Sequence, residues 1–249
     1  MKETRKNKIE KLLSKEYFCT PAQLNQKGTI YSVNINAKQP YIKILAYRNC
    51  VVVCTSKDLS EKIQMFLQDK NRDEIFELPF VYGQTIHYIP GSNVPDSGAL
   101  PPDCKYKFLP EKEISALNGL TGFENSVAFD EHGTTPTKAV GIAENNGKII
   151  GAAGASETSI SNIWEVGIDV MEKYRNAGLG TYLVNKLTKE LLARDITPFY
   201  SASVTNIGSQ MIASRCGYIP FWVDTFGTTL DGSSVYPEIV RHLSLEIHK

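Results

Sequence analysis

The sequence lacks a net charge, because 27 Lys and Arg residues balance 27 Asp and Glu residues. Proteins that bind nucleic acids or anionic membranes through long-range electrostatics carry an excess of basic residues. We therefore expect neither a nucleic acid nor a membrane surface as a partner of this chain.

Long apolar runs are also missing. No uninterrupted apolar segment approaches the ~20 residues that a membrane-spanning helix requires. Residues 1–8 are basic but lack the apolar region that follows in a secretory signal peptide. These absences predict a cytoplasmic protein.

Cysteine is scarce, and the five cysteines include no C-x-x-C pair. An odd number of thiols without metal-ligand spacing is typical of reduced cysteines rather than of disulfides or a zinc site. The motifs H-E-x-x-H and G-x-S-x-G are absent as well, so we expect no metal centre, and no nucleophile motif narrows the chemistry.

The strongest pattern in the chain is a strand, a loop and a helix within residues 163–218. Apolar residues alternate with polar or small ones in residues 164–170, which is the period of a β-strand. Residues 179–194 carry leucines spaced as on one helical face. The leucines of this stripe are Leu183, Leu187 and Leu191.

The loop between that strand and that helix reads Arg175-x-x-Gly178-x-Gly180. The first turn of a helix has unpaired N–H groups and a partial positive charge, and glycine lets phosphate oxygens approach the backbone. The dinucleotide fingerprint G-x-G-x-x-G and the P-loop G-x-x-x-x-G-K-[ST] are both absent. We predict that a phosphorylated ligand of another kind binds at residues 175–180.

This R-x-x-G-x-G motif resembles the pyrophosphate-binding motif of the GNAT N-acetyltransferases, which use acetyl-CoA. A second segment, with Asn206, Ser209 and the ending Gly217-Tyr218, resembles the family's other signature. Two motifs in the right order are much more specific than either alone. The resemblance covers roughly residues 105–249, and it extends more loosely to a branch of two-part bacterial acetyltransferases that includes the zwittermicin-resistance enzymes.

The expected architecture is of the α/β (α+β) class. The resemblance implies a GNAT fold with a mixed central sheet in the C-terminal half, in which the strands at Trp164 and Pro198 splay apart around the pantetheine arm. Proline and glycine are frequent in residues 90–102, which favours a linker there. The expected division is a smaller α+β domain (1–95), a linker (96–104) and the acetyltransferase domain (105–249).

Periodicity and turn residues predict the remaining elements. A hairpin turn is expected at Asn145-Asn146-Gly147, and Phe66 is expected on the buried face of the helix after Ser56. The expected helices are residues 1–18, the one after Ser56, 73–77, 111–120, 123–129, 179–194 and 207–216. The expected strands are residues 41–47, 50–54, 80–89, 138–144, 148–154, 164–170, 198–204, 220–226 and 240–247.

The resemblance also implies roles for individual residues. Backbone amides of the loop would hold the pyrophosphate, while strand backbone and two polar side chains would bind the pantetheine and polarise the thioester carbonyl. Arg175 would contact a phosphate or serve a structural role. The implied acetyl-CoA-binding residues are Ile168, Asp169, Val170, Arg175, Asn176, Ala177, Gly178, Leu179, Gly180, Thr181, Asn206 and Ser209.

Glu165 matches the position of a catalytic glutamate in several members of the family, and we expect it to take a proton from the amine. The alternative, a surface or substrate-binding carboxylate, is equally compatible with the sequence. Asp169 shares its strand face and is the second candidate, although a structural hydrogen-bonding role suits it better. The family's usual tyrosine, which donates a proton to the CoA thiolate, is replaced by Ala213. Ser214, Tyr200, Tyr218 or water could take its place.

These observations predict an acetyl-CoA-dependent N-acetyltransferase that acts on a primary amine of a small-molecule acceptor. Two alternatives remain: a non-catalytic acyl-CoA-binding regulatory module, which the loss of the tyrosine at Ala213 would suit, and a protein N-acetyltransferase. The N-terminal half would shape the acceptor pocket or mediate self-association, for example in a homodimer.

Overall fold

The structure, a computed structural model, describes residues 4–78 and 81–229. The chain divides into two compact units. Among the described residues, they comprise 4–12 with 86–221, here called the large unit, and 13–78 and 81–85 with 222–229, here called the small unit.

This division differs from the predicted one, which separated the chain at residues 96–104. The segment around Pro95 and Asp96 is held to the large unit by a hydrogen bond and an ion pair. The Asn185 side chain donates a hydrogen bond to the Pro95 carbonyl at 2.9 Å, and Lys189 forms an ion pair with Asp96 at 2.8 Å. Whether the predicted parts act as separate functional domains stays a prediction.

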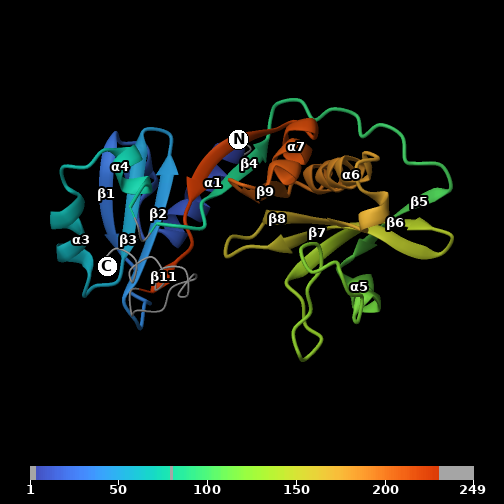
Figure 1. The fold of residues 1–249 in the computed structure, drawn as a ribbon, viewed down its shortest axis with the longest axis horizontal. Helices are drawn as coiled ribbons and strands as arrows, with labels where there is room; N and C mark the ends of the chain where they lie inside the picture. The colour runs from blue at the N-terminus through green and yellow to red at the C-terminus, as the bar shows by residue number, and fades with distance from the viewer. Residues whose placement is uncertain (1–3, 79–80, 230–249) are drawn as a thin grey trace, which may run out of the picture. The chain divides into compact units, whose positions relative to one another are not determined.

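A mixed β-sheet forms the large unit (Figure 1), as predicted. Its strands are β4 (Thr85–Pro90), β5 (Cys104–Pro110), β6 (Thr137–Asn145), β7 (Lys148–Glu157), β8 (Ile163–Val170), β9 (Thr197–Ser203) and β10 (Tyr218–Asp224). Their order is β10-β4-β9-β8-β7-β6-β5. The strands β5 to β8 pair in antiparallel fashion, whereas β8 and β9 are parallel.

Helices cover both faces of this sheet (Figure 1). They are α5 (Glu111–Ile114), α6 (Leu179–Ala193) and α7 (Ile207–Arg215). Helix α1 (Arg5–Glu16) has residues in both units. Strand β6 alternates between the two faces, because Ala139 and Ala143 pack in the core that includes α6, while Val140 and Ile142 pack in the core that includes α5. The sheet therefore separates two hydrophobic cores.

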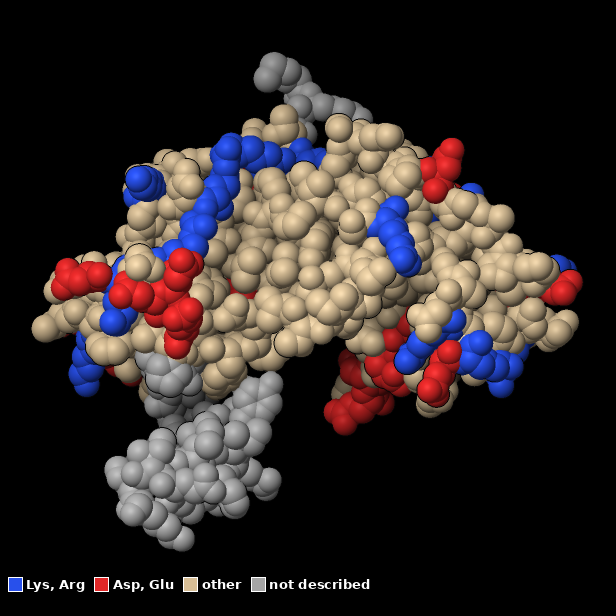
Figure 2. Space-filling model, turned by 45° about the horizontal axis from the view of Figure 1, so that its top comes forward, with Lys and Arg blue, Asp and Glu red and all other residues tan. Residues whose placement is uncertain are grey.

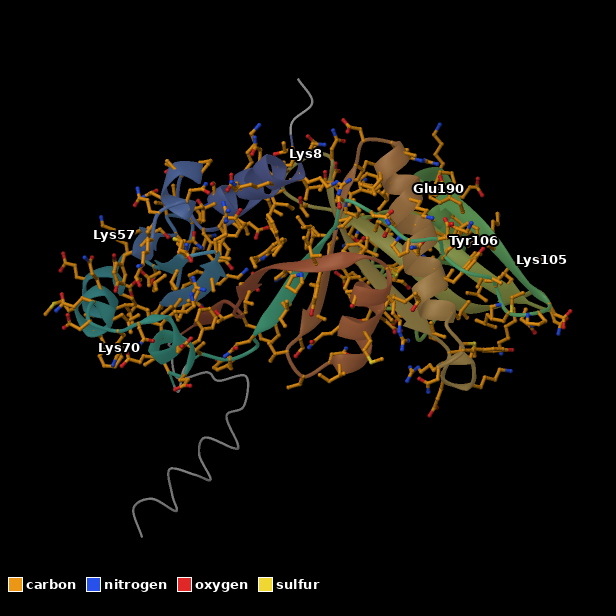
Figure 3. All side chains as sticks on the ribbon, turned by 90° about the horizontal axis from the view of Figure 1, so that it is seen from above. Lys8, Lys57, Lys70, Lys105, Tyr106 and Glu190 are labelled. Carbon is orange, nitrogen blue, oxygen red and sulfur yellow. The ribbon has the colours of Figure 1, made fainter. Side chains whose placement is uncertain are left out.

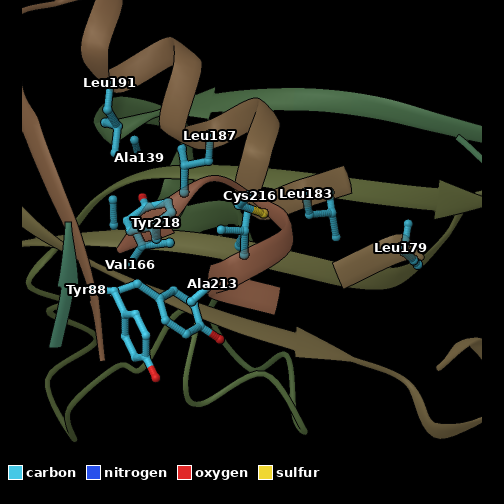
Figure 4. Packing of buried hydrophobic residues seen from close by; sticks show 14 of the residues in the cluster. Tyr88, Ala139, Val166, Leu179, Leu183, Leu187, Leu191, Ala213, Cys216 and Tyr218 are labelled. Atoms are coloured by element: carbon cyan, nitrogen blue, oxygen red, sulfur yellow. The ribbon is translucent and has the colours of Figure 1, made fainter. Parts of the chain in front are cut away.

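The predicted leucine stripe of α6 is confirmed. Leu183, Leu187 and Leu191 are fully buried against the sheet, where Ala139 and Val166 face them (Figure 4). Burying a leucine side chain stabilises a fold by roughly 1.5–3 kcal/mol. This stripe fixes α6, and with it the loop that precedes the helix, on the sheet.

Aromatic contacts join α6 to the edge strand β5, where Tyr106 lies near Glu190 of the helix (Figure 3). The rings of Tyr106 and Tyr182 lie 6.0 Å apart in an edge-to-face arrangement, and the Arg194 guanidinium lies 4.4 Å from the centre of the Phe108 ring. Burial raises the pKa of Tyr106, and the nearby Glu190 carboxylate adds to the shift. The phenol is therefore neutral and packs as part of the interface.

The predicted helix at residues 123–129 is wrong, because this segment forms turns. Its backbone crosses the sheet over two glycines that face each other on β7 and β8, Gly154 and Gly167. A Cβ atom at Gly154 would lie 1.6 Å from the Ser126 carbonyl oxygen, and one at Gly167 would lie 1.7 Å from that of Asn125. Only glycine at both positions allows the loop to approach so closely.

Gly154→Ala should therefore destabilise the large unit by roughly 1–3 kcal/mol, the usual range for overpacking. The obstructing atom is backbone, so the loop at Ser126 has to move. Thermal or urea unfolding measures the loss. Gly208→Ala is the control, since its Cβ would meet nothing closer than 3.7 Å; equal stability of the two variants would contradict this account of the glycine pair.

The small unit contains β1 (Gly28–Val33), β2 (Tyr41–Tyr47), β3 (Cys50–Thr55) and β11 (Thr228–Thr229), with α2 (Pro21–Leu24), α3 (Ser60–Leu67) and α4 (Arg72–Phe76). The strand β3 lies between β1 and β2, and the predicted hairpin of β2 and β3 is confirmed. The end of β10 is bonded to the rest of this unit through Asp224. The Tyr17 hydroxyl donates a hydrogen bond to its carboxylate at 2.8 Å, and Lys43 lies 3.4 Å from the same carboxylate.

Three other predictions need correction. Phe66 is 56% exposed, because α3 buries Ile63 and Leu67 instead. The helix predicted at residues 111–120 is only α5 followed by a 3-10 turn, and the strand predicted at residues 80–89 begins at Thr85. The strand predicted at residues 240–247 lies outside the described residues.

On the face shown in Figure 2, basic and acidic side chains are interspersed. Within the described part of the chain, no helix combines the length and the apolar character that crossing a bilayer requires.

Candidate active site

The parallel pair β8 and β9 separates partway along its length. The pairing runs from Ile163 opposite Thr197 to Val166 opposite Tyr200 and then stops, although β8 continues to Val170. The predicted splay of these strands is therefore confirmed. Two cavities border the separated ends.

The first, which we call the loop cavity, has a volume of about 660 Å³. It is lined by the end of β8, the glycine loop, the start of α6 and one side of α7. The lining residues are Asn125, Ile168, Asp169, Val170, Arg175, Asn176, Gly178, Leu179, Gly180, Thr181, Asn206, Gly208, Ser209, Met211, Ile212 and Arg215. Every predicted acetyl-CoA-binding residue except Ala177 is among them.

The second, which we call the Glu165 cavity, has a volume of about 440 Å³. It is lined by Asn125, Ser156, Glu165, Val166, Gly167, Ile168, Tyr200, Ser201, Ala202, Ser203, Asn206 and Ser209. Four residues line both cavities: Asn125, Ile168, Asn206 and Ser209. The two cavities therefore adjoin each other between the splayed strands.

The two glycines of the loop serve different purposes. Gly178 has φ +80° at the N-cap of α6, and a Cβ there would meet nothing within 4 Å, so the space in front of the helix is open. A Cβ at Gly180 would lie 3.0 Å from Ile212, so this glycine sets the packing of α6 on α7. The hydrogen bond from the Tyr182 amide to the Gly178 carbonyl, at 3.0 Å, leaves the earlier amides of the helix available to an anion.

Two arginines add positive charge to the loop cavity. Arg175 is exposed, and its Nε donates to the Val170 carbonyl at 3.0 Å, which ties the loop to the end of β8. Arg215 reaches the same cavity from the last turn of α7. The sequence motifs did not indicate Arg215, because its distance from the loop depends on how α7 packs.

Asp169 holds the loop that crosses the sheet. Its carboxylate accepts hydrogen bonds from the Asn125 side-chain amide at 2.7 Å, the Ser126 backbone amide at 2.7 Å and the Ser126 hydroxyl at 2.9 Å. These bonds agree with the structural role that the sequence favoured for Asp169. They also hold Asn125 in place as a residue that lines both cavities, which sequence reasoning missed.

Glu165 lies exposed in the second cavity, where its carboxylate accepts a hydrogen bond from the Ser201 hydroxyl. It faces Ser156 across the β7–β8 pair. No lysine or arginine is among the residues that line this cavity. The carboxylate is therefore its only charged lining group, and a cationic ligand would match it.

The start of α7 lies where the cavities meet. The Asn206 side-chain oxygen accepts a hydrogen bond from the Ser209 amide at 3.1 Å and so caps the helix. Burial raises the pKa of Tyr200, which lines the Glu165 cavity, to about 12, and the nearby Ser209 side chain opposes this shift. Ala213 is fully buried in the core behind this turn (Figure 4).

Residues 121–220 match the family model described as GNAT acetyltransferase. This segment contains β6 to β9, α6 and α7, and thus every element of the site. No match was found among curated proteins.

Solved structures give weaker likenesses. They include a protein of Novosphingobium aromaticivorans DSM 12444 described as a GNAT-family acetyltransferase (19% identity, 59% of this chain and 66% of that chain covered, TM-score 0.45). A GCN5-related N-acetyltransferase-like protein of Streptococcus suis 89/1591 shares 16% identity over 72% of this chain and 71% of its own, with a TM-score of 0.44. A GNAT-family acetyltransferase of Colwellia psychrerythraea shares 12% sequence identity over 74% of this chain and 64% of its own, with a TM-score of 0.45.

The chain thus spans about two thirds of the length of these structures, 66%, 71% and 64%. Their TM-scores lie below 0.5, so the assignment depends on the family model and not on them. The two-part bacterial branch stays a prediction. Over residues 121–220, the chain is similar to the GNAT acetyltransferases.

Proposed function

We propose that this protein transfers the acetyl group of acetyl-CoA to a primary amine of a small molecule. The observation that carries the proposal is the continuity of the two cavities. One begins at a helix N-terminus with two arginines, and the other contains a single carboxylate, Glu165. Such a path joins a site for a polyphosphate to a site for a cationic amine.

The residues of the loop cavity fit acetyl-CoA. The free amides at the start of α6, with Arg175 and Arg215, would hold its phosphates. The unpaired edges of β8 and β9 beyond Val166 offer backbone groups to the pantetheine amides. When bound, acetyl-CoA supplies an activated acetyl group as a thioester.

Glu165 would act on the acceptor. An alkylamine with a pKa of roughly 10 arrives protonated at neutral pH, so a base has to remove a proton before the nitrogen can attack. Glu165 is the only carboxylate that lines its cavity, and Ser201 orients it. A volume of about 440 Å³ favours a small acceptor over a folded protein surface.

The alternative from another class is a regulatory module that binds acyl-CoA without reacting. It would keep the glycine loop and need no base next to the thioester. The position of Glu165 in an adjoining cavity favours the enzyme over this alternative.

Release of the CoA thiol from acetyl-CoA in the presence of a panel of primary amines tests the proposal, with CoA binding measured by calorimetry alongside. We expect CoA binding and turnover with at least one class of amine. Binding without turnover on any small amine would contradict the small-molecule transferase and favour the regulatory module or a protein acceptor.

A further inference from the structure

The reaction proposed above requires a proton for the departing thiolate, and the structure offers a donor at another place than the family's usual one. Ala213 cannot supply a proton, and it is fully buried in the core. The donor therefore has to come from a different element of the site.

Tyr200 occupies the point where the strands separate. It is the last residue of β9 that pairs with β8, opposite Val166. Only 2% of its surface is exposed, yet it lines the Glu165 cavity. The side chain of Ser209, which lines both cavities, lies near enough to influence the Tyr200 phenol. Tyr200 thus lies at the junction between them.

The junction is also where the acyl group has to lie. A donor held by its phosphates at Gly178 and directed toward Glu165 passes from the loop cavity into the Glu165 cavity, and Ser209 and Ile168 belong to both. The thioester sulfur would therefore pass close to the Tyr200 hydroxyl.

The two other hydroxyl side chains that the sequence left open as donors lie outside both cavities. The Tyr218 hydroxyl is buried 2.7 Å from the Thr188 hydroxyl, and Tyr218 lines neither cavity. Ser214 is exposed and is also absent from both linings. Among the three side chains that the sequence left open, only Tyr200 borders the site.

We propose that Tyr200 is the general acid of the reaction. This assignment rests on the proposed function. As the bond between the acetyl carbon and the amine nitrogen forms and the carbon–sulfur bond breaks, the electron pair of the broken bond goes to sulfur. Tyr200 donates its hydroxyl proton to that sulfur. The phenolate regains a proton from water, which balances the proton that the nitrogen loses. The raised pKa, about 12, keeps the phenol protonated until that step.

Tyr200→Phe tests this assignment, because it removes only the hydroxyl. We expect kcat to fall roughly a hundredfold, the usual contribution of a general acid, with little change in the Kd of acetyl-CoA. With acetyl-seleno-CoA, whose leaving group is far more acidic, the penalty should shrink, because that group departs without a proton.

A binding measurement without turnover gives a second readout. A hydroxyl that donates to sulfur stabilises the bound thiolate, so CoA should bind wild type more tightly as the pH rises through the thiol pKa, by roughly tenfold. Desulfo-CoA should show no such gain. In Tyr200→Phe, the gain for CoA should be lost while desulfo-CoA binds as in wild type.

Tyr218→Phe is the matched control, since it removes a buried tyrosine hydroxyl outside both cavities; its kcat and its pH-dependent CoA binding should equal those of wild type. Wild-type kcat and CoA binding in Tyr200→Phe would overturn the assignment, and so would an equal loss of CoA and desulfo-CoA. If wild type itself binds no CoA or acetylates no amine, the proposed function fails first, which separates the two failures.

Discussion

Gly178→Asp should weaken CoA binding by roughly a hundredfold or more. A carboxylate at this N-cap would stand where the phosphates are expected, and two like charges about 4 Å apart near a protein surface repel by about 4 kcal/mol. The space that the side chain would enter is open, since no atom lies within 4 Å of the added Cβ. The effect is therefore one of charge and occupancy rather than of misfolding.

A matched variant separates charge from backbone strain. Gly178 has φ +80°, a conformation that asparagine and aspartate tolerate better than other non-glycine residues. Gly178→Asn has nearly the same shape and the same backbone demand without the charge, so it should lose much less affinity. Gly119→Asp, at another positive-φ glycine with open space and outside both cavities, should bind CoA as wild type does. Equal calorimetric affinities of Gly178→Asp and Gly178→Asn would contradict a phosphate site at this loop.

Glu165→Gln should lower kcat by roughly a hundredfold and leave the CoA affinity unchanged. Glutamine keeps the size of the side chain and can still accept a hydrogen bond from Ser201, but it cannot take a proton from the amine. CoA thiol release and calorimetry on the same preparation measure the two quantities.

The pH profile of Glu165→Gln separates a base from a binding carboxylate. If Glu165 removes the proton, the variant should recover as the pH approaches the amine pKa of roughly 10, because more acceptor then arrives neutral. If Glu165 only binds the ammonium, its loss should raise KM and should not be rescued by high pH. Glu157→Gln is the control, because Glu157 is an exposed carboxylate on β7 that lines neither cavity; this variant should behave as wild type.

Local patterns were sufficient for several parts of the fold. The α6 stripe, the β2–β3 hairpin and the turn at Asn146-Gly147 follow from side chains a few residues apart, and the structure has all three. Residues 123–129 had helix-compatible spacing, but packing against Gly154 and Gly167 determined their conformation. The predicted burial of Phe66 was wrong because tertiary packing selects which apolar residues of α3 are buried, and these are Ile63 and Leu67.

For the site, the sequence by itself determined the glycine loop, because a strand, a loop and a helix N-terminus are contiguous in the chain. It also placed Glu165 and Asp169 on one strand. Only the tertiary structure brought Asn125, Arg215 and Tyr200 to the cavities, since their positions depend on the register of β8 against β9, on the packing of α7, and on a loop held by Asp169. Those contacts join residues far apart in the sequence, where no local period carries a signal.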